Sequence, residues 1–420
     1  MVRWKQAETE MAYHSMQVIS KLLEHGHEAY WVGGCVRDEL MGRPVHDMDI
    51  TTSALPEEVE SIFERTVPTG IRHGTVTVLN GSYAFEVTTY RVEGAYENHR
   101  RPAEVAFVSD LKEDLRRRDF TMNAIARAFD GTMVDPYGGT EDIGKGLVRC
   151  VGNARTRFQE DALRMVRCIR FASVFEFGIA YRTWRGLLEE GEGIHYVALE
   201  RFRVELEKLM EGKTPSRGLR LLHRSGLLRH ARVPFTYEPE EDLIAEIDEI
   251  PPDHHGIRWA LLLYACGVKS EAAHGYLRDW TFPNAEREEI AGILSVGEAV
   301  QAMDGISPYR EQWLRTVLRF GPEAAGQWLH MAGRIAGQRP DAYPREVLAN
   351  AREWTLQMGI YHIADLSVTG RDLLGLTGRK GGPWIGEILG ELLLKVASQN
   401  LPNDKEILID EVKRVISTNE

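Results

Sequence analysis

The sequence predicts an α+β protein, with a mixed α/β head followed by a long, entirely helical part. The strand-like segments are rich in β-branched and aromatic residues, and all of them lie before about residue 150. Beyond that point apolar residues recur mostly at helical spacing, as in Leu199–Met210 and Leu219–Leu227. The 420 residues are enough for about two to four structural units.

In the head, residues 1 to about 30 suggest a helix that ends near Gly26, followed by a short strand at 28–32. Gly33 and Gly34 break that strand, a helix begins at Val36, and residues 48–52 alternate as a strand does. Two further strands at 75–79 and 83–90 flank Asn80-Gly81, a strong hairpin signal. In the helical part, residues 251–253 and 338–340 predict breaks between helical units.

Composition is that of an ordinary soluble protein, with 43% hydrophobic and 27% charged residues. No apolar run approaches the roughly 20 residues that a membrane helix needs, and Met1–Gln6 lead into a polar stretch unlike a signal peptide. Cys35, Cys150, Cys168 and Cys266 lie far apart, so we expect reduced thiols. We therefore expect a cytoplasmic protein without a membrane or a protein partner.

The net charge of −12 argues weakly against nucleic-acid binding. Attraction to phosphate is local at physiological salt, however, so clustered basic residues can still bind RNA. Arg116–Arg118 form one cluster, and a second is opposed only by Glu160 and Asp161. The second cluster comprises Arg149, Arg155, Arg157, Arg164, Arg167 and Arg170. A solvated helix face is the ordinary explanation for either cluster alone.

Asp47 and Asp49 are the most informative residues. On a strand, residues two apart point to the same face with Cα atoms about 7 Å apart. Two such carboxylates can bind Mg²⁺ together with substrate phosphates. Such a pair also arises by chance, but here Gly33-Gly34 precede a helix that carries Arg37. Glycines allow backbone N–H groups to approach phosphates, and helix N-termini favour anions, so Gly34 and Arg37 are candidates for nucleotide binding.

The segment Gly33–Asp38, followed by Leu40, Gly42 and Asp47–Asp49, resembles motif A of the polymerase-beta-like nucleotidyltransferases. It is most similar to that of the eubacterial-type (class II) CCA-adding enzymes and poly(A) polymerases. Four later segments resemble motifs B to E of that family in order and spacing: Arg117–Ala124, Asp135–Gly139, Glu160–Arg164 and Glu200–Leu206. The C-terminal segments Gly381–Trp384 and Leu401–Asp404 resemble the helical tail of its Bacillus-like branch.

The resemblance implies a nucleotidyltransferase head at 1–148, a base-recognising neck at 149–220, a body at 221–310 and a tRNA-binding tail at 311–420. It implies that CTP and ATP are added to the 3′ end of tRNA without a template. Two Mg²⁺ ions, held by Asp47 and Asp49, would promote attack of the tRNA 3′-hydroxyl on the α-phosphate, and pyrophosphate would leave. Arg118, Arg167 and Arg170 would bind the triphosphate or orient the base-reading residues.

Asp161 and Arg164 are the predicted base readers. At positions i and i+3 of a helix they are neighbours, and a carboxylate beside a guanidinium presents acceptors next to donors. Cytosine and adenine offer the complementary order on their Watson–Crick edges, whereas guanine and uracil offer the reverse. One Asp–Arg pair can therefore accept C and A and reject G and U.

Two features leave alternatives open. Glu86, on a strand near the Asp pair, could be a third metal ligand, a general base, or a partner that holds Arg91 in place. Residues 91–102 are polar with weak strand periodicity, and could be a surface loop without a role. In the resembled family a flexible loop between motifs A and B is associated with addition of the terminal A.

The first alternative to a CCA-adding enzyme is a poly(A) polymerase, since the head and neck motifs are shared. Enzymes that add only A or only CC are variants of the main prediction, and the loop argues against the latter. A catalytically inactive RNA-binding protein would not need the intact Asp pair, and a small-molecule nucleotidyltransferase would not need the long helical part. The sequence lacks the paired His-Asp of a phosphohydrolase domain, so we do not predict that activity.

Overall fold

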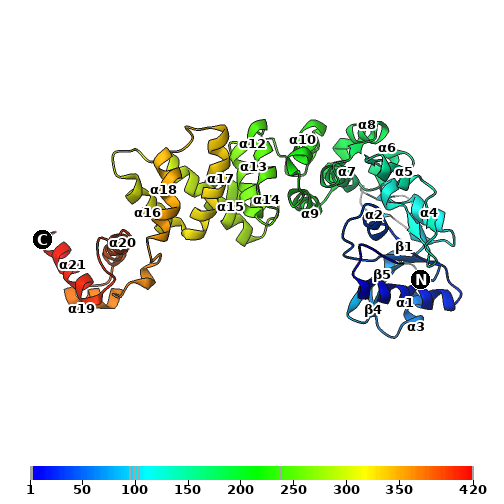
Figure 1. The fold of residues 1–420 in the computed structure, drawn as a ribbon, viewed down its shortest axis with the longest axis horizontal. Coiled ribbons are helices and arrows are strands. Elements are labelled where there is room, and N and C mark those ends of the chain that lie inside the picture. The colour runs from blue at the N-terminus through cyan, green and yellow to red at the C-terminus, as the bar shows by residue number, and fades with distance from the viewer. Residues whose placement is uncertain (1–2, 94–95, 98–100, 103–104, 237, 419–420) are drawn as a thin grey trace. The chain divides into compact units, whose positions relative to one another are not determined.

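The computed structural model describes residues 3–93, 96–97, 101–102, 105–236 and 238–418 (Figure 1). The chain divides into two compact units, Met1–Thr236 and Tyr237–Glu420. Every described strand lies in the first unit, and the second unit is helical. The predicted α+β class, with a mixed head and a helical remainder, is confirmed.

A seven-stranded mixed sheet, in the order β11-β10-β1-β2-β5-β4-β3, organises the head. Its strands β2 and β5 run parallel, whereas the other neighbouring pairs are antiparallel. The strands are β1 (Ala29–Val32), β2 (Ile50–Thr52), β3 (Thr66–Gly70), β4 (Thr75–Asn80), β5 (Tyr83–Thr89), β10 (Ala126–Arg127) and β11 (Met133–Val134).

The predicted hairpin joins β4 and β5. Asn80 pairs with Tyr83, which leaves Gly81 and Ser82 as a two-residue turn. Gly81 has a φ of 61°, and a Cβ at this position would lie 2.6 Å from the His14 ring. Glycine is favoured in this turn, because the backbone is left-handed and a Cβ would displace the neighbouring His14 ring.

The segment after β5 is more regular than its sequence predicts. The strand β6 (Arg91–Glu93) pairs with β9 (Val105–Phe107), and β7 (Tyr96–Glu97) pairs with β8 (Arg101–Pro102). Antiparallel pairing satisfies the backbone groups whatever the side-chain pattern, so the weak periodicity was misleading. The remainder of the predicted loop, at 94–95 and 98–100, lies outside the described residues.

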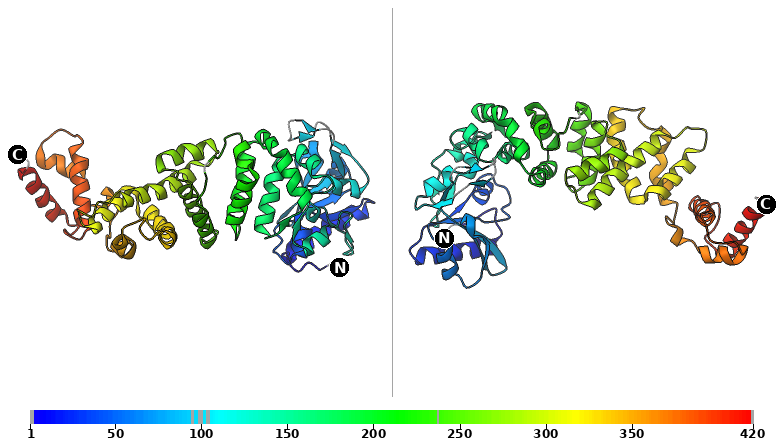
Figure 2. Two further views of the ribbon diagram at one scale, coloured as in Figure 1. Left: turned by 90° about the horizontal axis from the view of Figure 1, so that it is seen from above. Right: turned by 180° about the vertical axis from the view of Figure 1, so that it is seen from behind.

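Helices cover the sheet and lead from it into the neck (Figure 1 and Figure 2). Ile19 and Leu22 of α1 are fully buried in the same core as Trp31, Val76 and Val78. The head helices are α1 (Thr9–Glu24), α2 (Gly34–Leu40), α3 (Pro56–Ile62), α4 (Leu111–Arg116), the 3₁₀ helix η2 (Thr121–Asn123) and α5 (Gly139–Gly144).

The neck is built on α7, which packs against α9 and α10, while α6 packs against α8. A short parallel pair, β12 (Leu147–Val148) and β13 (Gly178–Ile179), joins it to the head. Gly226, with a φ of 72°, separates α10 from α11 and interrupts the predicted helix at 219–227. The helices are α6 (Ala154–Glu160), α7 (Leu163–Val174), α8 (Tyr181–Glu190), η3 (Gly191–Tyr196), α9 (Leu199–Met210), α10 (Pro215–Ser225) and α11 (Leu227–His230).

In the second unit, α15 packs against α13, α14, α16 and α17. The predicted breaks at 251–253 and 338–340 are confirmed, because α13 begins at His255 and α17 ends at Gln338. The helices of this part are α12 (Glu241–Glu246), η4 (Ile247–Glu249), α13 (His255–Ala265), α14 (Ser270–Asp279), α15 (Asn284–Gln301), α16 (Tyr309–Phe320), α17 (Pro322–Gln338) and α18 (Arg345–Leu356).

The C-terminal helices form a separate apolar cluster, in which Leu373, Leu392 and Leu408 are buried. At the start of α19, the Asp372 carboxylate accepts from both the backbone N–H and the hydroxyl of Thr369. The elements are η5 (Ile363–Asp365), α19 (Gly370–Thr377), α20 (Trp384–Ala397) and α21 (Lys405–Thr418).

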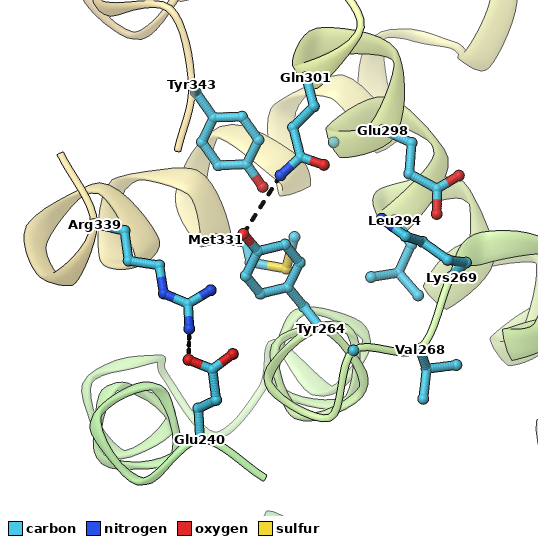
Figure 3. A pocket seen from close by; sticks show the side chains of 12 residues that line it. Glu240, Tyr264, Val268, Lys269, Leu294, Glu298, Gln301, Met331, Arg339 and Tyr343 are labelled. Atoms are coloured by element: carbon cyan, nitrogen blue, oxygen red, sulfur yellow. Dashed lines mark hydrogen bonds and ion pairs between the residues drawn. The ribbon is translucent and has the colours of Figure 1, made fainter. Parts of the chain in front are cut away.

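A cavity of about 190 Å³ lies among α13, α15 and α17 (Figure 3). Arg339 forms an ion pair with Glu240 on one wall, and the Gln301 amide donates to the Tyr264 hydroxyl at 3.5 Å. Across the described part of the chain, no helix is both long and apolar enough to cross a bilayer. All four cysteines are free thiols, as predicted, and all four are buried.

Candidate active site

A cavity of about 610 Å³ between head and neck brings together nine of the ten predicted site residues. They come from α2, from the segments that precede β2 and follow α4, from the junction of α6 and α7, and from α7 itself. The nine are Gly34, Arg37, Asp47, Asp49, Arg118, Asp161, Arg164, Arg167 and Arg170. Glu86 is not among the lining residues.

Asp47 and Asp49 lie in the segment that leads into β2, not on the strand itself. The predicted strand at 48–52 is therefore too long at its start, because backbone pairing with β1 and β5 begins at Ile50. Burial raises the pKa of Asp49 to about 6, and the charges of Asp47 and Glu86 add to this increase. Arg118 opposes it. The site thus holds more negative charge than its own arginine neutralises.

Such a donor set fits a hard divalent cation. Carboxylate oxygens are the ligands that Mg²⁺ prefers, and Mg²⁺ is usually held by one or two carboxylates plus substrate phosphates. In the described part of the chain, no group of three His, Cys, Asp or Glu side chains is arranged to hold a metal. Two carboxylates that line one cavity, as Asp47 and Asp49 do, suit ions that share their ligands with a phosphate-bearing ligand.

We expect Asp49→Asn to stabilise the metal-free protein at pH 7.5 by up to about 3 kcal/mol, because a pKa raised from 3.8 to about 6 makes ionisation costly in the fold. The pKa is raised in the folded state, so the cost is present above pH 6 and disappears as the pH falls below 4. Urea unfolding in EDTA at pH 7.5 and pH 4 measures the difference. If the variant and the wild type were equally stable at pH 7.5, the idea that an ionised Asp49 destabilises the metal-free fold would be wrong.

Gly33 and Arg37 shape the wall beside the Asp pair. Gly33 has a φ of 77°, and a Cβ there would lie 3.1 Å from Nη1 of Arg118. Arg37 donates Nε and Nη2 to Asp38, and its Nη1 donates to Oδ1 of Asn123 at 2.7 Å. A planar guanidinium held on two sides keeps a fixed orientation.

Buried carboxylates hold the other arginines of the cavity. Asp114 binds Arg117 and Arg118, which outweigh its burial and lower its pKa. Asp119 accepts from Arg167 at 2.9 Å and from Asn123, and its pKa is lowered to about 2 although burial alone would raise it. These carboxylates remain charged at neutral pH, so the arginines stay in place before any nucleotide binds.

Glu205 of α9 is 4% exposed, and its carboxylate contacts two arginines. It accepts from Nε of Arg170 at 2.5 Å and lies 3.5 Å from Nη1 of Arg167. Asp119 and Glu205 together balance the charges of Arg167 and Arg170, but the cavity lining as a whole contains seven arginines and one lysine against five aspartates. A polyanion such as a triphosphate is the complementary ligand.

Asp161 and Arg164 both line the cavity, but the prediction that they share one helix is wrong. The helix α6 ends at Glu160, Asp161 has an extended backbone (φ −138°, ψ 104°), and α7 begins at Leu163. The Asp161 carboxylate accepts from the backbone of Leu163 at 3.1 Å, which competes with continuation of the helix.

Different side chains orient these two residues. Arg201 of α9 donates to Oδ2 of Asp161 at 2.9 Å. Arg164 donates to Glu160 at 2.9 Å and to the backbone oxygen of Arg117 at 3.0 Å. The acceptor and the donor are therefore fixed separately, each by its own partners at the wall of the cavity.

Sequence reasoning assigned no role to several side chains that the structure places here. They are Asp38, Asp119, Asn123, Phe171, Arg201 and Glu205. All of these except Phe171 lay in segments already matched to motifs A, B and E, which was the only signal for them. Phe171 carried no such signal, because an apolar residue at helical spacing is typical of a buried core position.

Comparison with known proteins gives matches along most of the chain. Residues 29–149 match the family model described as the poly A polymerase head domain. Residues 176–234 match the probable RNA and SrmB-binding site of polymerase A, and residues 252–412 match the putative domain 2 of tRNA nucleotidyltransferase.

The chain is 38% identical over 403 residues to the CCA-adding enzyme of Geobacillus stearothermophilus, covering 93% of this chain and 94% of that protein. The enzyme of the same name from Bacillus cereus strain Q1 is 38% identical over 395 residues, covering 93% and 95%. The crystal structure of the Bacillus stearothermophilus CCA-adding enzyme in complex with CTP superposes with a TM-score of 0.81, at 33% identity and 98% and 99% coverage. The fold is also that of the Thermotoga maritima CCA-adding enzyme complexed with tRNA (TM-score 0.70, 21% identity, 98% and 97% coverage).

Proposed function

This chain belongs to the CCA-adding enzymes, and we propose that it adds C, C and A to the 3′ end of tRNA from CTP and ATP. No nucleic-acid template is used, and pyrophosphate is released at each step. The observation that carries the proposal is one cavity in which the aspartate pair, a group of arginines and the Asp161–Arg164 pair all meet, in a chain related to CCA-adding enzymes over 93% of its length.

Enzymes of this family use divalent metal ions, and here Asp47 and Asp49 would hold two Mg²⁺ ions. When bound, these ions supply Lewis-acid activation of the tRNA 3′-hydroxyl and neutralise charge on the departing pyrophosphate. The 3′-oxygen forms a bond to the α-phosphorus, the bond from that phosphorus to the pyrophosphate oxygen breaks, and the hydroxyl proton leaves to solvent or a base. Glu86, whose charge acts on Asp49, is the candidate for that base or for a further ligand.

The chain's own cations and amides bind the nucleotide. Arg37, Arg118, Arg167 and Arg170 would contact the triphosphate, and the backbone at Gly34 would approach it closely. Asp161 would accept from the exocyclic amine of C or A while Arg164 donates to the adjacent ring nitrogen.

We assign catalysis to a head at 1–148, base recognition to a neck at 149–220, and tRNA binding to the body at 221–310 and the tail at 311–420. The match of residues 29–149 to a polymerase head supports the first boundary. The helical remainder would bind the upper half of tRNA; the Thermotoga maritima CCA-adding enzyme, which shares the fold, has been solved in complex with tRNA.

One assay tests this function. The purified protein is incubated with Mg²⁺, labelled CTP or ATP, and tRNA that ends at N, NC or NCC, where N is the discriminator nucleotide. We expect incorporation of CTP on tRNA that ends at N or NC, and incorporation of ATP only on tRNA that ends at NCC. Long A-tails on unrelated RNA would identify a poly(A) polymerase, ATP addition without CTP addition an A-adding enzyme, and no incorporation an inactive RNA-binding protein.

Deleting residues 94–101 should leave CTP incorporation intact and block the terminal A. Adenine is larger than cytosine, so the same reading pair must shift to accept it, and we propose that the segment between motifs A and B supplies that shift. The β6–β9 ladder flanks the deletion and would be closed by residues 102–104, a loop length common in hairpins. Stepwise addition to tRNA ending at N measures the effect. Near-normal addition of A by the deletion variant would rule out this role.

A further inference from the structure

Phe171 of α7 is surrounded by arginines. Its ring centroid lies 4.0 Å from Cζ of Arg170, 5.2 Å from that of Arg37 and 5.4 Å from that of Arg167. The side chain is 3% exposed, yet it lines the cavity together with all three arginines. One ring thus contacts cations from both the head and the neck.

The ring is itself held by a run of aromatic side chains. Phe175 stacks on it with centroids 5.4 Å apart and planes inclined by 18°, and Phe120 meets it edge-on at 5.8 Å. Phe175 also lies 4.9 Å from Cζ of Arg37 and 5.0 Å from that of Arg43. The orientation of Phe171 is therefore fixed by packing on both sides.

A ring and a carboxylate orient an arginine in different ways. All five N–H donors of a guanidinium lie in its plane, so a carboxylate that holds it occupies some of these donors and competes with phosphate. An aromatic ring attracts the cation through the ring's π-face and uses none of the donors that lie at the edge of the guanidinium. Phe171 can therefore orient arginines without reducing their capacity for a ligand.

We propose that Phe171 is a positioning residue for the nucleoside triphosphate, and that its ring holds Arg37, Arg167 and Arg170 alongside their carboxylate partners without using any further N–H donor. This proposal rests on the function proposed above, in which these arginines bind the triphosphate. The base is read elsewhere, by Asp161 and Arg164. Loss of the ring should therefore weaken contacts with phosphates and leave base selection unchanged.

The test compares Phe171→Leu and Phe171→Met, which keep an apolar side chain without a ring, with Phe171→Tyr, which keeps the ring. We expect the KM for both CTP and ATP to rise by roughly tenfold in the ring-free variants, with kcat changed by less than about threefold. The Tyr variant should remain within about threefold of the wild type in KM.

Phe158→Leu is the matched control, since Phe158 is a buried phenylalanine of the neck outside the cavity. It should lower the melting temperature as Phe171→Leu does, but leave KM unchanged. Equilibrium binding of CTP, CMP and cytidine supplies a second readout, because loss of the ring should reduce the preference for CTP over cytidine. The Met variant, whose flexible side chain can refill the site, provides this readout if the Leu variant does not fold.

Unchanged KM and an unchanged preference for CTP over cytidine in a folded ring-free variant would overturn the role of Phe171. So would a rise in KM that Phe171→Tyr does not rescue, or one that Phe158→Leu reproduces. In each case the wild type would still complete CCA ends. Failure of the wild type to incorporate either nucleotide would instead count against the proposed function.

Discussion

Asp47→Ala and Asp49→Ala should each abolish incorporation of both CTP and ATP, with a rate loss on the order of 10³-fold or more. We expect one pair of carboxylates to serve both nucleotides, since the described lining of the cavity contains a single Asp-x-Asp. Replacing either residue removes oxygen ligands at the point where charge develops in the transition state. Binding of tRNA should persist, because its contacts are assigned mainly to the helical body and tail.

Single-turnover addition to tRNA ending at N or at NCC measures the rates, and filter binding measures tRNA affinity. Asp130→Ala is the matched control, because Asp130 is an exposed aspartate of the head outside the cavity. It should retain full activity. If either active-site variant lost addition of only one nucleotide, the idea of a single catalytic site for C and A would be wrong.

Much of the fold was predictable because it depends on local pattern. The β4–β5 hairpin follows from Asn80-Gly81 between two β-branched runs, and the helix Leu199–Met210 was predicted with the bounds it has in the structure. Of the seven strands in the sheet, the sequence predicted four and missed β3, β10 and β11. The sequences of these three strands are short or polar and show little alternation of apolar and polar residues. These strands exist because neighbouring strands supply their backbone partners.

The site was predictable in its members but not in its internal connections. Motif resemblance identified nine of the lining residues. It could not show that Glu205 holds Arg167 and Arg170, or that Arg201 holds Asp161 across 40 positions of sequence. Such pairings depend on how α7 and α9 pack against each other, and no local pattern encodes that packing. The break of the helix at Asp161 likewise depends on these partners.

The separate anchoring of Asp161 and Arg164 strengthens the case that they select the base. We expect Asp161→Ala and Arg164→Ala to slow CTP and ATP addition and to relax discrimination against UTP and GTP by roughly 10- to 100-fold. In the wild type, UTP or GTP would place donor against donor and acceptor against acceptor, leaving charged groups unpaired at a cost of about 1–3 kcal/mol each. Removing one reader removes part of that penalty along with part of the normal binding.

Arg201→Ala provides a graded comparison, because it leaves both readers in place but frees the Asp161 carboxylate from its 2.9 Å bond. We expect a smaller loss of discrimination than in Asp161→Ala, since a mobile carboxylate still accepts from C and A but also tolerates a misplaced partner. Arg155→Ala, an exposed neck arginine paired with Glu190, is the control and should change neither rate nor selectivity. The ratio of kcat/KM for CTP and UTP on tRNA ending at N measures the effect for each variant. An unaltered ratio in both Asp161→Ala and Arg164→Ala would remove these residues from the base pocket, whatever their effect on rate.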